Sequence, residues 1–158
     1  MYSEEKKRVT ELLLQLIDSL SDQEKREFVD VIMKRGRGMP ISVFQSKLSG
    51  LELLVRYLRD VEQKSFKEIA QMLNRNVQTI YTTYRKAKIK FPDQLDLSNY
   101  SVIIPLDIFT NRKFSVLESI VFYLKNQGLN FRKIATLLNR DYNTVRTVYL
   151  RYSKKNEK

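Results

Sequence analysis

The sequence predicts an all-α protein in which two tandem trihelical units follow an N-terminal helical hairpin. Three observations support this fold class. Glycine and proline are scarce, with 4 and 3 copies in 158 residues, which favours long helices over turn-rich sheets. Apolar residues recur at helical spacing, as at Leu51, Leu54, Val55 and Leu58. A long stretch of the chain also occurs twice, which predicts two copies of one structural unit.

The repeat extends over all three helices of each predicted unit. Residues 51–59 (LELLVRYLR) and 117–125 (LESIVFYLK) share 5 of 9 positions, and residues 66–90 share 10 of 25 with residues 131–155. The lead-in PISVF at residues 40–44 resembles PLDIF at residues 105–109. We therefore divide the chain into a hairpin, a first unit, a linker and a second unit, at residues 1–36, 37–90, 91–101 and 102–158.

Helix-capping patterns place the helices inside these segments. Ser21 is followed by Glu24 three positions later, which is a capping-box pattern for the second hairpin helix, and that helix is expected to end near Gly36. Ser65 and Glu68 form the same pattern at the second helix of the first unit. Asn130 is the expected N-cap at the equivalent place in the second unit.

A short helix, a tight turn and a basic third helix make up the helix-turn-helix arrangement. Here the second helix is only about two turns long, and Ala70 and Ala135 are the small residues that allow it to pack closely on the third helix. The third helices are expected to begin after the N-caps Asn76 and Asp141 and to run to about Ile89 and Tyr152. Asn74 and Asn139 replace the usual glycine of the turn, and asparagine tolerates the left-handed backbone. Neither unit is expected to carry the β-wing of winged helices.

The third helices supply the predicted DNA contacts. The N-terminal half of such a helix enters the major groove, so its polar residues are predicted to read bases; these are Gln78, Thr79, Tyr81, Thr82, Asn143, Thr144, Arg146 and Thr147. Basic residues of the turns and helix ends are predicted to contact phosphates; these are Arg75, Arg85, Lys86, Lys88, Lys90, Arg140, Arg151, Lys154 and Lys155. Tyr81 and Tyr142 lie outside the apolar stripes, whereas the aromatic residues at equivalent apolar positions are expected in the core.

Charge and composition favour a polyanionic partner and argue against catalysis. The net charge is +11, distributed as −1 over residues 1–35, +7 over residues 36–90 and +5 over residues 91–158. Cysteine and histidine are both missing, which excludes disulfides, thiolate metal sites and histidine-based catalysis. Asp93 and Asp96 could form a metal-binding pair, but turn and cap roles in the linker are favoured. No enzyme activity, metal or cofactor is expected.

The first repeat resembles a known family. The run SFKEIAQMLNRNVQTIYTTYRKAK at residues 65–88 resembles the DNA-binding fourth region of bacterial sigma factors and the related response-regulator helix-turn-helix. Residues 131–152 match this pattern more loosely, and IPLDIF together with the LNR and TY elements resembles small sigma-like helix-turn-helix proteins of archaea. The resemblance covers about half the chain and implies a helix-turn-helix fold that binds DNA. Helices for binding core polymerase or melting promoters are not evident, so the chain is not interpreted as a sigma factor.

The leading interpretation is a sequence-specific double-stranded DNA-binding protein that regulates transcription, in the cytoplasm of an archaeal or bacterial cell and associated with the nucleoid. One alternative is an architectural or chromosome or plasmid segregation protein. Another is a helical adaptor that binds RNA polymerase. No membrane association is expected, and residues 1–36 are candidates for homodimerisation or for docking on the other units. If both third helices bind successive major grooves, about 34 Å apart, the two half-sites should differ, because Tyr81 aligns with Arg146.

Overall fold

The structure, a computed structural model, describes residues 2–35 and 38–157. The chain divides into two compact units, Met1–Arg37 and Gly38–Lys158. The first unit contains α1 (Tyr2–Asp18) and α2 (Asp22–Arg35). The predicted capping box is present at α2, because the Ser21 amide donates to the Glu24 carboxylate at 2.8 Å and the Glu24 amide donates to the Ser21 Oγ at 3.3 Å. The predicted helix end at Gly36 lies outside the described residues.

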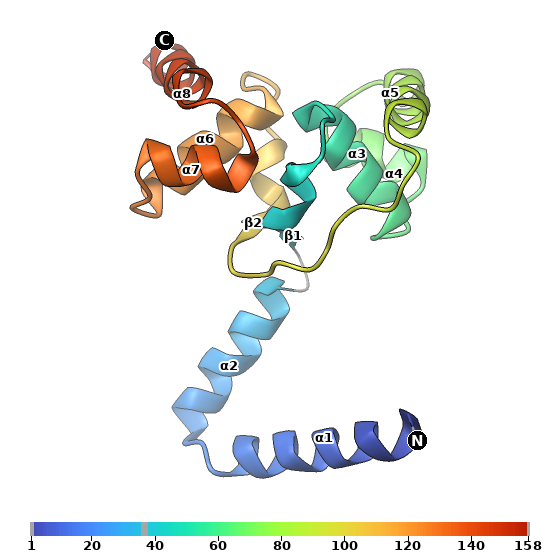
Figure 1. Cartoon of the computed structure of the whole chain (residues 1–158), viewed down its shortest axis with the longest axis vertical. Helices are drawn as coiled ribbons and strands as arrows, with labels where there is room; N and C mark the ends of the chain where they lie inside the picture. Colours follow the sequence, from blue (N-terminus) through green and yellow to red (C-terminus); the bar gives the residue numbers. More distant parts are fainter. Residues whose placement is uncertain (1, 36–37, 158) are drawn as a thin grey trace. The chain divides into compact units, whose positions relative to one another are not determined.

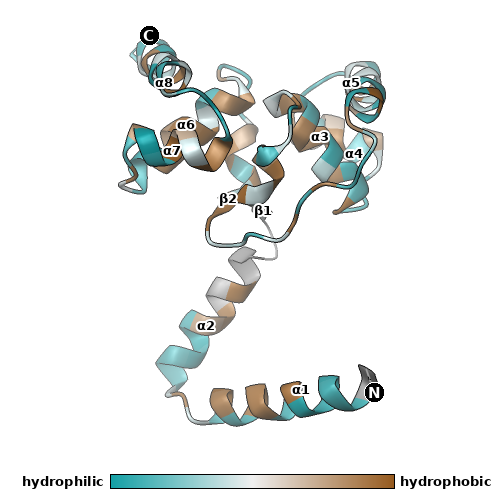
Figure 2. Ribbon diagram, viewed as in Figure 1, coloured by the Kyte–Doolittle hydropathy of each residue, from teal (hydrophilic) through white to brown (hydrophobic). Residues whose placement is uncertain are grey.

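The hairpin of α1 and α2 exposes its apolar side chains. Leu12 and Leu16 of α1 are 59% and 62% exposed, and Val29 and Ile32 of α2 are also exposed. Figure 2 shows the hydrophobic residues along α1. Among the hairpin side chains that the structure describes, none is buried. The hairpin therefore lacks a core of its own in the described part of the unit.

The second unit holds two sets of three helices. Residues 50–90 form α3 (Gly50–Asp60), α4 (Phe66–Met72) and α5 (Val77–Lys90). The second set is α6 (Val116–Asn126), α7 (Phe131–Leu138) and α8 (Tyr142–Asn156). A short strand and a 3-10 helix precede each set, namely β1 (Gly38–Pro40) with η1 (Ile41–Gln45), and β2 (Ile103–Pro105) with η2 (Leu106–Phe109). The chain is thus mostly helical.

The two strands correct the all-α prediction. β1 pairs antiparallel with β2, with Gly38 opposite Pro105, Met39 opposite Ile104 and Pro40 opposite Ile103. The Met39 and Ile104 side chains are fully buried. A strand of three residues is too short to show the alternation that identifies strands in a sequence, and its partner lies far along the chain. The similarity of the two lead-ins was visible in the sequence, but their pairing was not.

The predicted caps are present in both helix sets. Asn76 accepts a hydrogen bond from the Gln78 amide, and the capping box of Ser65 is complete. In the second set, Asn130 and Asp141 cap α7 and α8. The α5 helix ends one residue beyond the predicted end at Ile89, and α8 ends four residues beyond the predicted end at Tyr152. This extension is consistent with basic residues in the last turns, which interact favourably with the helix dipole.

The first helix of each set starts at a capping box that sequence analysis missed. The Ser49 Oγ accepts from the Glu52 amide while the Glu52 carboxylate accepts from the Ser49 amide. Ser115 and Glu118 do the same at α6. The serine precedes the first apolar residue of each stripe, so the local signal was available in both copies.

One core runs through both helix sets. The buried side chains of α3 and α6 form its centre, and they include Leu54, Leu58, Ile120 and Leu124. The inner faces of the third helices are buried at Ile80, Ala87, Val145 and Val148. In Figure 1, α5 and α8 lie at the two ends of this unit, on the side away from β1 and β2.

Residues 91–101 connect the helix sets without regular helix or strand. They are nevertheless fixed to the first set. The Ser42 hydroxyl donates to the Asp96 carbonyl at 2.8 Å and accepts from the Asn99 amide at 3.2 Å, and Leu95 is buried. The connection therefore packs along the protein surface, unlike a free tether.

Candidate nucleic-acid interface

The turns before α5 and α8 have the same backbone geometry. Asn74 and Asn139 both adopt the left-handed conformation, with φ of 49° in each case. The amide of the following arginine then donates to a carbonyl of the preceding helix, from Arg75 to Ala70 at 2.8 Å and from Arg140 to Ala135 at 2.9 Å. Such bonds satisfy carbonyls at a helix C-terminus that would otherwise lack a partner. The prediction that asparagine supports this turn is confirmed.

The two short helices hold α5 and α8 through the same aromatic contacts. The Phe66 ring meets the Tyr84 ring edge-on at 5.3 Å, and Phe131 meets Tyr149 at 5.3 Å. A cation lies over each phenylalanine, from Arg59 at 4.8 Å in the first set and from a lysine at 4.9 Å in the second. Ala70 and Ala135 are buried, as expected for small residues between closely packed helices. Both α5 and α8 are therefore packed against their own helix sets by equivalent aromatic contacts.

The N-terminal halves of α5 and α8 present polar side chains to solvent. All of the predicted base-reading residues are exposed, namely Gln78, Thr79, Tyr81, Thr82, Asn143, Thr144, Arg146 and Thr147. Tyr81 packs its ring edge-on against Phe66 at 5.4 Å while remaining 41% exposed. Each of these side chains is thus available for contact with the edges of bases.

The predicted phosphate-contacting residues separate into two groups. Those with solvent-exposed side chains are Arg85, Lys86, Lys88, Lys90, Arg151 and Lys154. The Lys88 ammonium also lies 3.7 Å from the Asp60 carboxylate. Arg75, Arg140 and Lys155 are half-buried. Charge alone put all of these residues in one class, and only the tertiary structure distinguishes them.

Lys90 and Lys155 have carboxylate partners inside the protein. The Lys90 Nζ lies 2.6 Å from the Glu52 Oε1, and the Lys155 Nζ lies 2.8 Å from the Glu118 Oε2. Burial raises the pKa of each glutamate, but hydrogen bonds from its lysine and its capping serine outweigh burial and lower the pKa below the ordinary value. The two pairs join the last turn of α5 or α8 to the first turn of α3 or α6. Neither pair was predicted, because the partners lie far apart in sequence.

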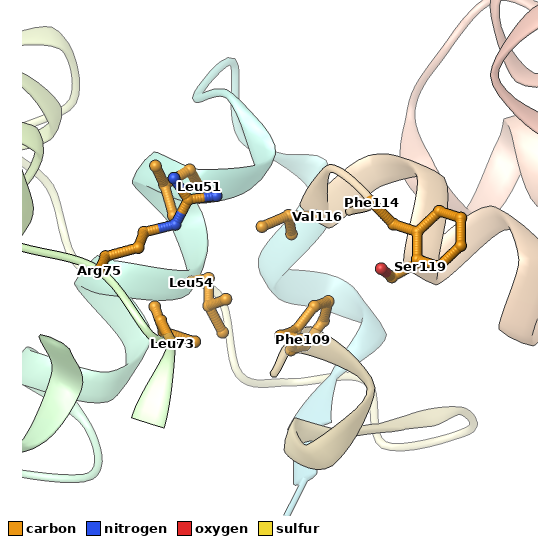
Figure 3. Close-up of a pocket in the computed structure, with 8 residues that line it drawn as sticks. All are labelled: Leu51, Leu54, Leu73, Arg75, Phe109, Phe114, Val116 and Ser119. Carbon is orange, nitrogen blue, oxygen red and sulfur yellow. The ribbon is translucent and has the colours of Figure 1, made fainter. Parts of the chain in front are cut away.

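Arg75 and Arg140 lie where the two helix sets meet. The Arg140 guanidinium, in the second repeat, donates to the carbonyl of Leu48, in the first repeat, at 2.9 Å. Arg75 lines a small cavity between the sets, together with Leu73, Phe109 and Phe114 (Figure 3). Burial, and secondarily the neighbouring positive charge of Arg112, lowers the pKa of Arg75. These positions support the contact between the sets, so we do not include them in the proposed interface.

Arg56 is a buried residue that sequence analysis missed. Its side chain is 1% exposed, and its guanidinium donates to the Asp60 carboxylate at 2.8 Å and to the carbonyls of Phe91 and Asp93. It thereby fixes the chain as it leaves α5. The equivalent residue of the second repeat is Phe122, which is apolar, and this correspondence was the available signal that the position is internal.

Within residues 2–35 and 38–157, no three carboxylate or other ligating side chains come close enough to hold a metal ion. None of the described helices is long and apolar enough to cross a membrane.

Comparison with known protein families identifies the first helix-turn-helix. Residues 57–91 match the family described as Sigma-70, region 4. The matched segment contains the end of α3 and all of α4 and α5. The predicted resemblance is thus confirmed for these residues, and the match to a region 4 helix-turn-helix suggests DNA binding by this segment. The match does not extend to the second repeat. No curated protein and no solved structure matches the chain.

Proposed function

We propose that this protein is a sequence-specific double-stranded DNA-binding regulator of transcription that places α5 and α8 in major grooves. The observation that carries the proposal is the exposed polar half of α5 within a segment that matches sigma-70 region 4. The second repeat enters the proposal through its equivalent helices, turn and exposed residues. Each repeat then acts as one helix-turn-helix unit.

The chemistry of the exposed residues supports sequence reading. Glutamine or asparagine can make paired hydrogen bonds with adenine, and arginine can do so with guanine. Gln78, Asn143 and Arg146 are placed in the first two turns of their helices and are free of the core. Arg151 and Lys154 lie further along α8 and are expected to meet phosphates, which fix the position of the protein without reading sequence.

Two alternative functions are less well supported by these surfaces. An architectural or segregation protein that coats DNA would need phosphate contacts but no base-reading side chains at the helix N-termini. A helical adaptor for RNA polymerase would be favoured by acidic residues along the exposed helices. The sequences of α5 and α8 contain no aspartate or glutamate.

We further propose that the hairpin at residues 1–36 joins two copies of the chain in a homodimer. The hairpin has apolar side chains that are half or more exposed along α1, including Leu12 and Leu16. Its net charge of −1 sets it apart from the basic remainder of the chain. A second copy presents the same apolar face, so a two-fold arrangement would cover both faces at once.

The test of sequence reading compares two variants of α8: one lacks a predicted base-reading residue and the other lacks two predicted phosphate-contacting residues. A preferred duplex is first selected from random sequences and then titrated beside a scrambled duplex at several salt concentrations. Arg146→Ala should weaken binding to the preferred duplex by about 5- to 150-fold, which corresponds to about 1–3 kcal/mol, while leaving the scrambled duplex nearly unaffected. The matched control, Arg151→Ala with Lys154→Ala, should weaken binding to both duplexes and lower the salt slope by about 2.

Equal losses on both duplexes for Arg146→Ala would show that Arg146 is a phosphate contact. Selection that enriches no sequence would instead support the architectural alternative.

A further inference from the structure

We infer that the DNA site of this protein is an imperfect inverted repeat, in which two half-sites face each other about a centre. The inference rests on the proposed function, since it requires both α5 and α8 to bind DNA. A tandem repeat in a sequence leaves the orientation open, because the two units could be related by translation or by rotation. The contacts between the two repeats favour a two-fold rotation.

The first contact is the pairing of β1 with β2. Pro40 and Pro105 are equivalent residues of the two lead-ins, so Met39 is equivalent to Ile104. In the antiparallel ladder Met39 lies opposite Ile104, its own equivalent, while Pro40 lies opposite Ile103 and Gly38 opposite Pro105. Exchanging the two repeats leaves this register unchanged. Self-matching contact of this kind is the mark of a two-fold axis, as in an isologous interface between identical subunits.

The second contact lies at the start of α3 and α6. Gly50 and Val116 are the first residues of these two helices and are equivalent in the repeat. A Cβ placed on Gly50 would lie 3.1 Å from the Cβ of Val116. Equivalent residues that touch each other must lie close to the axis that relates them. The strands and the helix starts therefore mark the same two-fold relation at two separate places.

The third observation concerns the lead-ins, because η1 contacts the turn of the second repeat and η2 lines a cavity beside the turn of the first. The Gln45 side chain, after η1, donates to the Leu137 carbonyl at 2.8 Å, and the Asn139 side chain donates back to the Gln45 carbonyl at 3.2 Å. In the reverse direction, Leu73 and Arg75 line a cavity with Phe109 of η2 (Figure 3). The two lead-ins thus lie on corresponding sides of the axis, with a tighter contact at η1 than at η2.

The same axis must relate the helices that face DNA. The B-DNA backbone has local two-fold symmetry, and helix-turn-helix dimers align their own two-fold axis with it, which is why their operators are palindromic. Here the axis lies within one chain, with α5 and α8 at the two ends of the unit (Figure 1). The half-sites are therefore expected in opposite orientation.

Residue identities predict where the inverted repeat is imperfect. Thr82 and Thr147 are equivalent and identical, so they are expected to meet the same base pair in each half-site. Tyr81 and Arg146 are equivalent but different, so the base pair at that position should differ between the half-sites. Base pairs that face identical residues of α5 and α8 should therefore be the same in both half-sites, and base pairs that face different residues should differ.

The test uses the full chain and the duplex selected from random sequences. The two half-sites are rebuilt at unchanged spacing as an inverted pair, as a direct pair and as a scrambled duplex. We expect the inverted pair to bind at least tenfold more tightly than the direct pair, because turning one half-site mismatches several base pairs and each mismatch costs about 1–3 kcal/mol. Tightest binding to the direct pair would overturn this inference and leave the proposed function intact. Equal binding to all three duplexes would overturn the proposed function as well.

A matched pair of variants tests the symmetry directly. Tyr81→Arg makes α5 resemble α8 at this position and should shift preference by about tenfold or more toward an inverted pair built from two copies of the Arg146 half-site. Arg146→Tyr should shift preference toward two copies of the other half-site, and it changes a side chain that is exposed and makes no ring contact in the structure described. If either variant instead gains affinity for two copies of one half-site arranged as a direct repeat, the inference is overturned. Circular dichroism of both variants shows whether the fold is kept.

Discussion

The buried guanidinium of Arg56 allows a sharp test of how the first repeat holds its neighbouring chain. Its donors reach the Asp60 carboxylate and the carbonyls of Phe91 and Asp93. Arg56→Ala removes all of these bonds and the packing of the side chain stem. The two carbonyls are then left without this donor, and Asp60 keeps its bond from the Tyr84 hydroxyl at 2.7 Å.

The expected loss is about 3–5 kcal/mol, the usual effect of removing one partner of a buried ion pair. Since natural domains are stable by about 5–15 kcal/mol, this loss should be evident in urea unfolding followed by circular dichroism at pH 7. Arg59→Ala is the control, because Arg59 is only half-buried, donates one bond to the Lys64 carbonyl and lies over Phe66. The control should lose about 1–2 kcal/mol. If Arg56→Ala loses no more free energy of unfolding than Arg59→Ala, the assigned role of Arg56 is wrong.

Two further predictions concern acid stability and self-association. The lowered pKa values of Glu52 and Glu118 mean that the ionised carboxylates stabilise the fold at neutral pH, and that this stabilisation is lost as pH falls from 4.5 through the lowered values. The double change of both to glutamine, which can retain the capping box, should cost about 1–2 kcal/mol per site at pH 7 and flatten the acid side of a urea-midpoint profile; parallel profiles would contradict this. Changing Leu12 and Leu16 together to aspartate should convert a dimer to a monomer in light scattering, whereas Ile89→Asp should leave the mass unchanged; loss of the dimer in both variants would count against the hairpin.

Local signals predicted the helices and turns of this protein. Ser65 with Glu68, and Asn76 ahead of α5, identify helix starts within a few residues, because a cap satisfies amides of its own first turn. Asn74 could be assigned to a left-handed turn because asparagine tolerates that backbone conformation. The exposed faces of α5 and α8 followed from the apolar stripes, and every predicted base-reading residue is exposed.

Pairings between distant residues could not be predicted in this way. The sheet joins β1 to a strand more than sixty residues away, and Lys90 meets Glu52 only after α5 has packed on α3. Arg140 and Lys155 were grouped with the phosphate contacts by charge, and the structure gives both an intramolecular partner. The sequence does not show whether a basic residue near a helix end points to solvent or to a neighbouring helix.

The fusion of two repeats in one chain has a physical consequence at the axis and at the DNA-facing helices. In a dimer of two identical single-repeat chains, a residue at the axis must pack against its own copy. Valine at both positions 50 and 116 would crowd, because a Cβ placed on Gly50 would lie 3.1 Å from the Val116 Cβ. Glycine at both positions would leave a gap. A single chain can place the small residue opposite the large one. The same freedom extends to Tyr81 and Arg146, which a homodimer would be forced to make identical. On the proposed function, one chain therefore combines the two-fold geometry suited to DNA with half-sites of different sequence, so that the protein binds its site in one direction only.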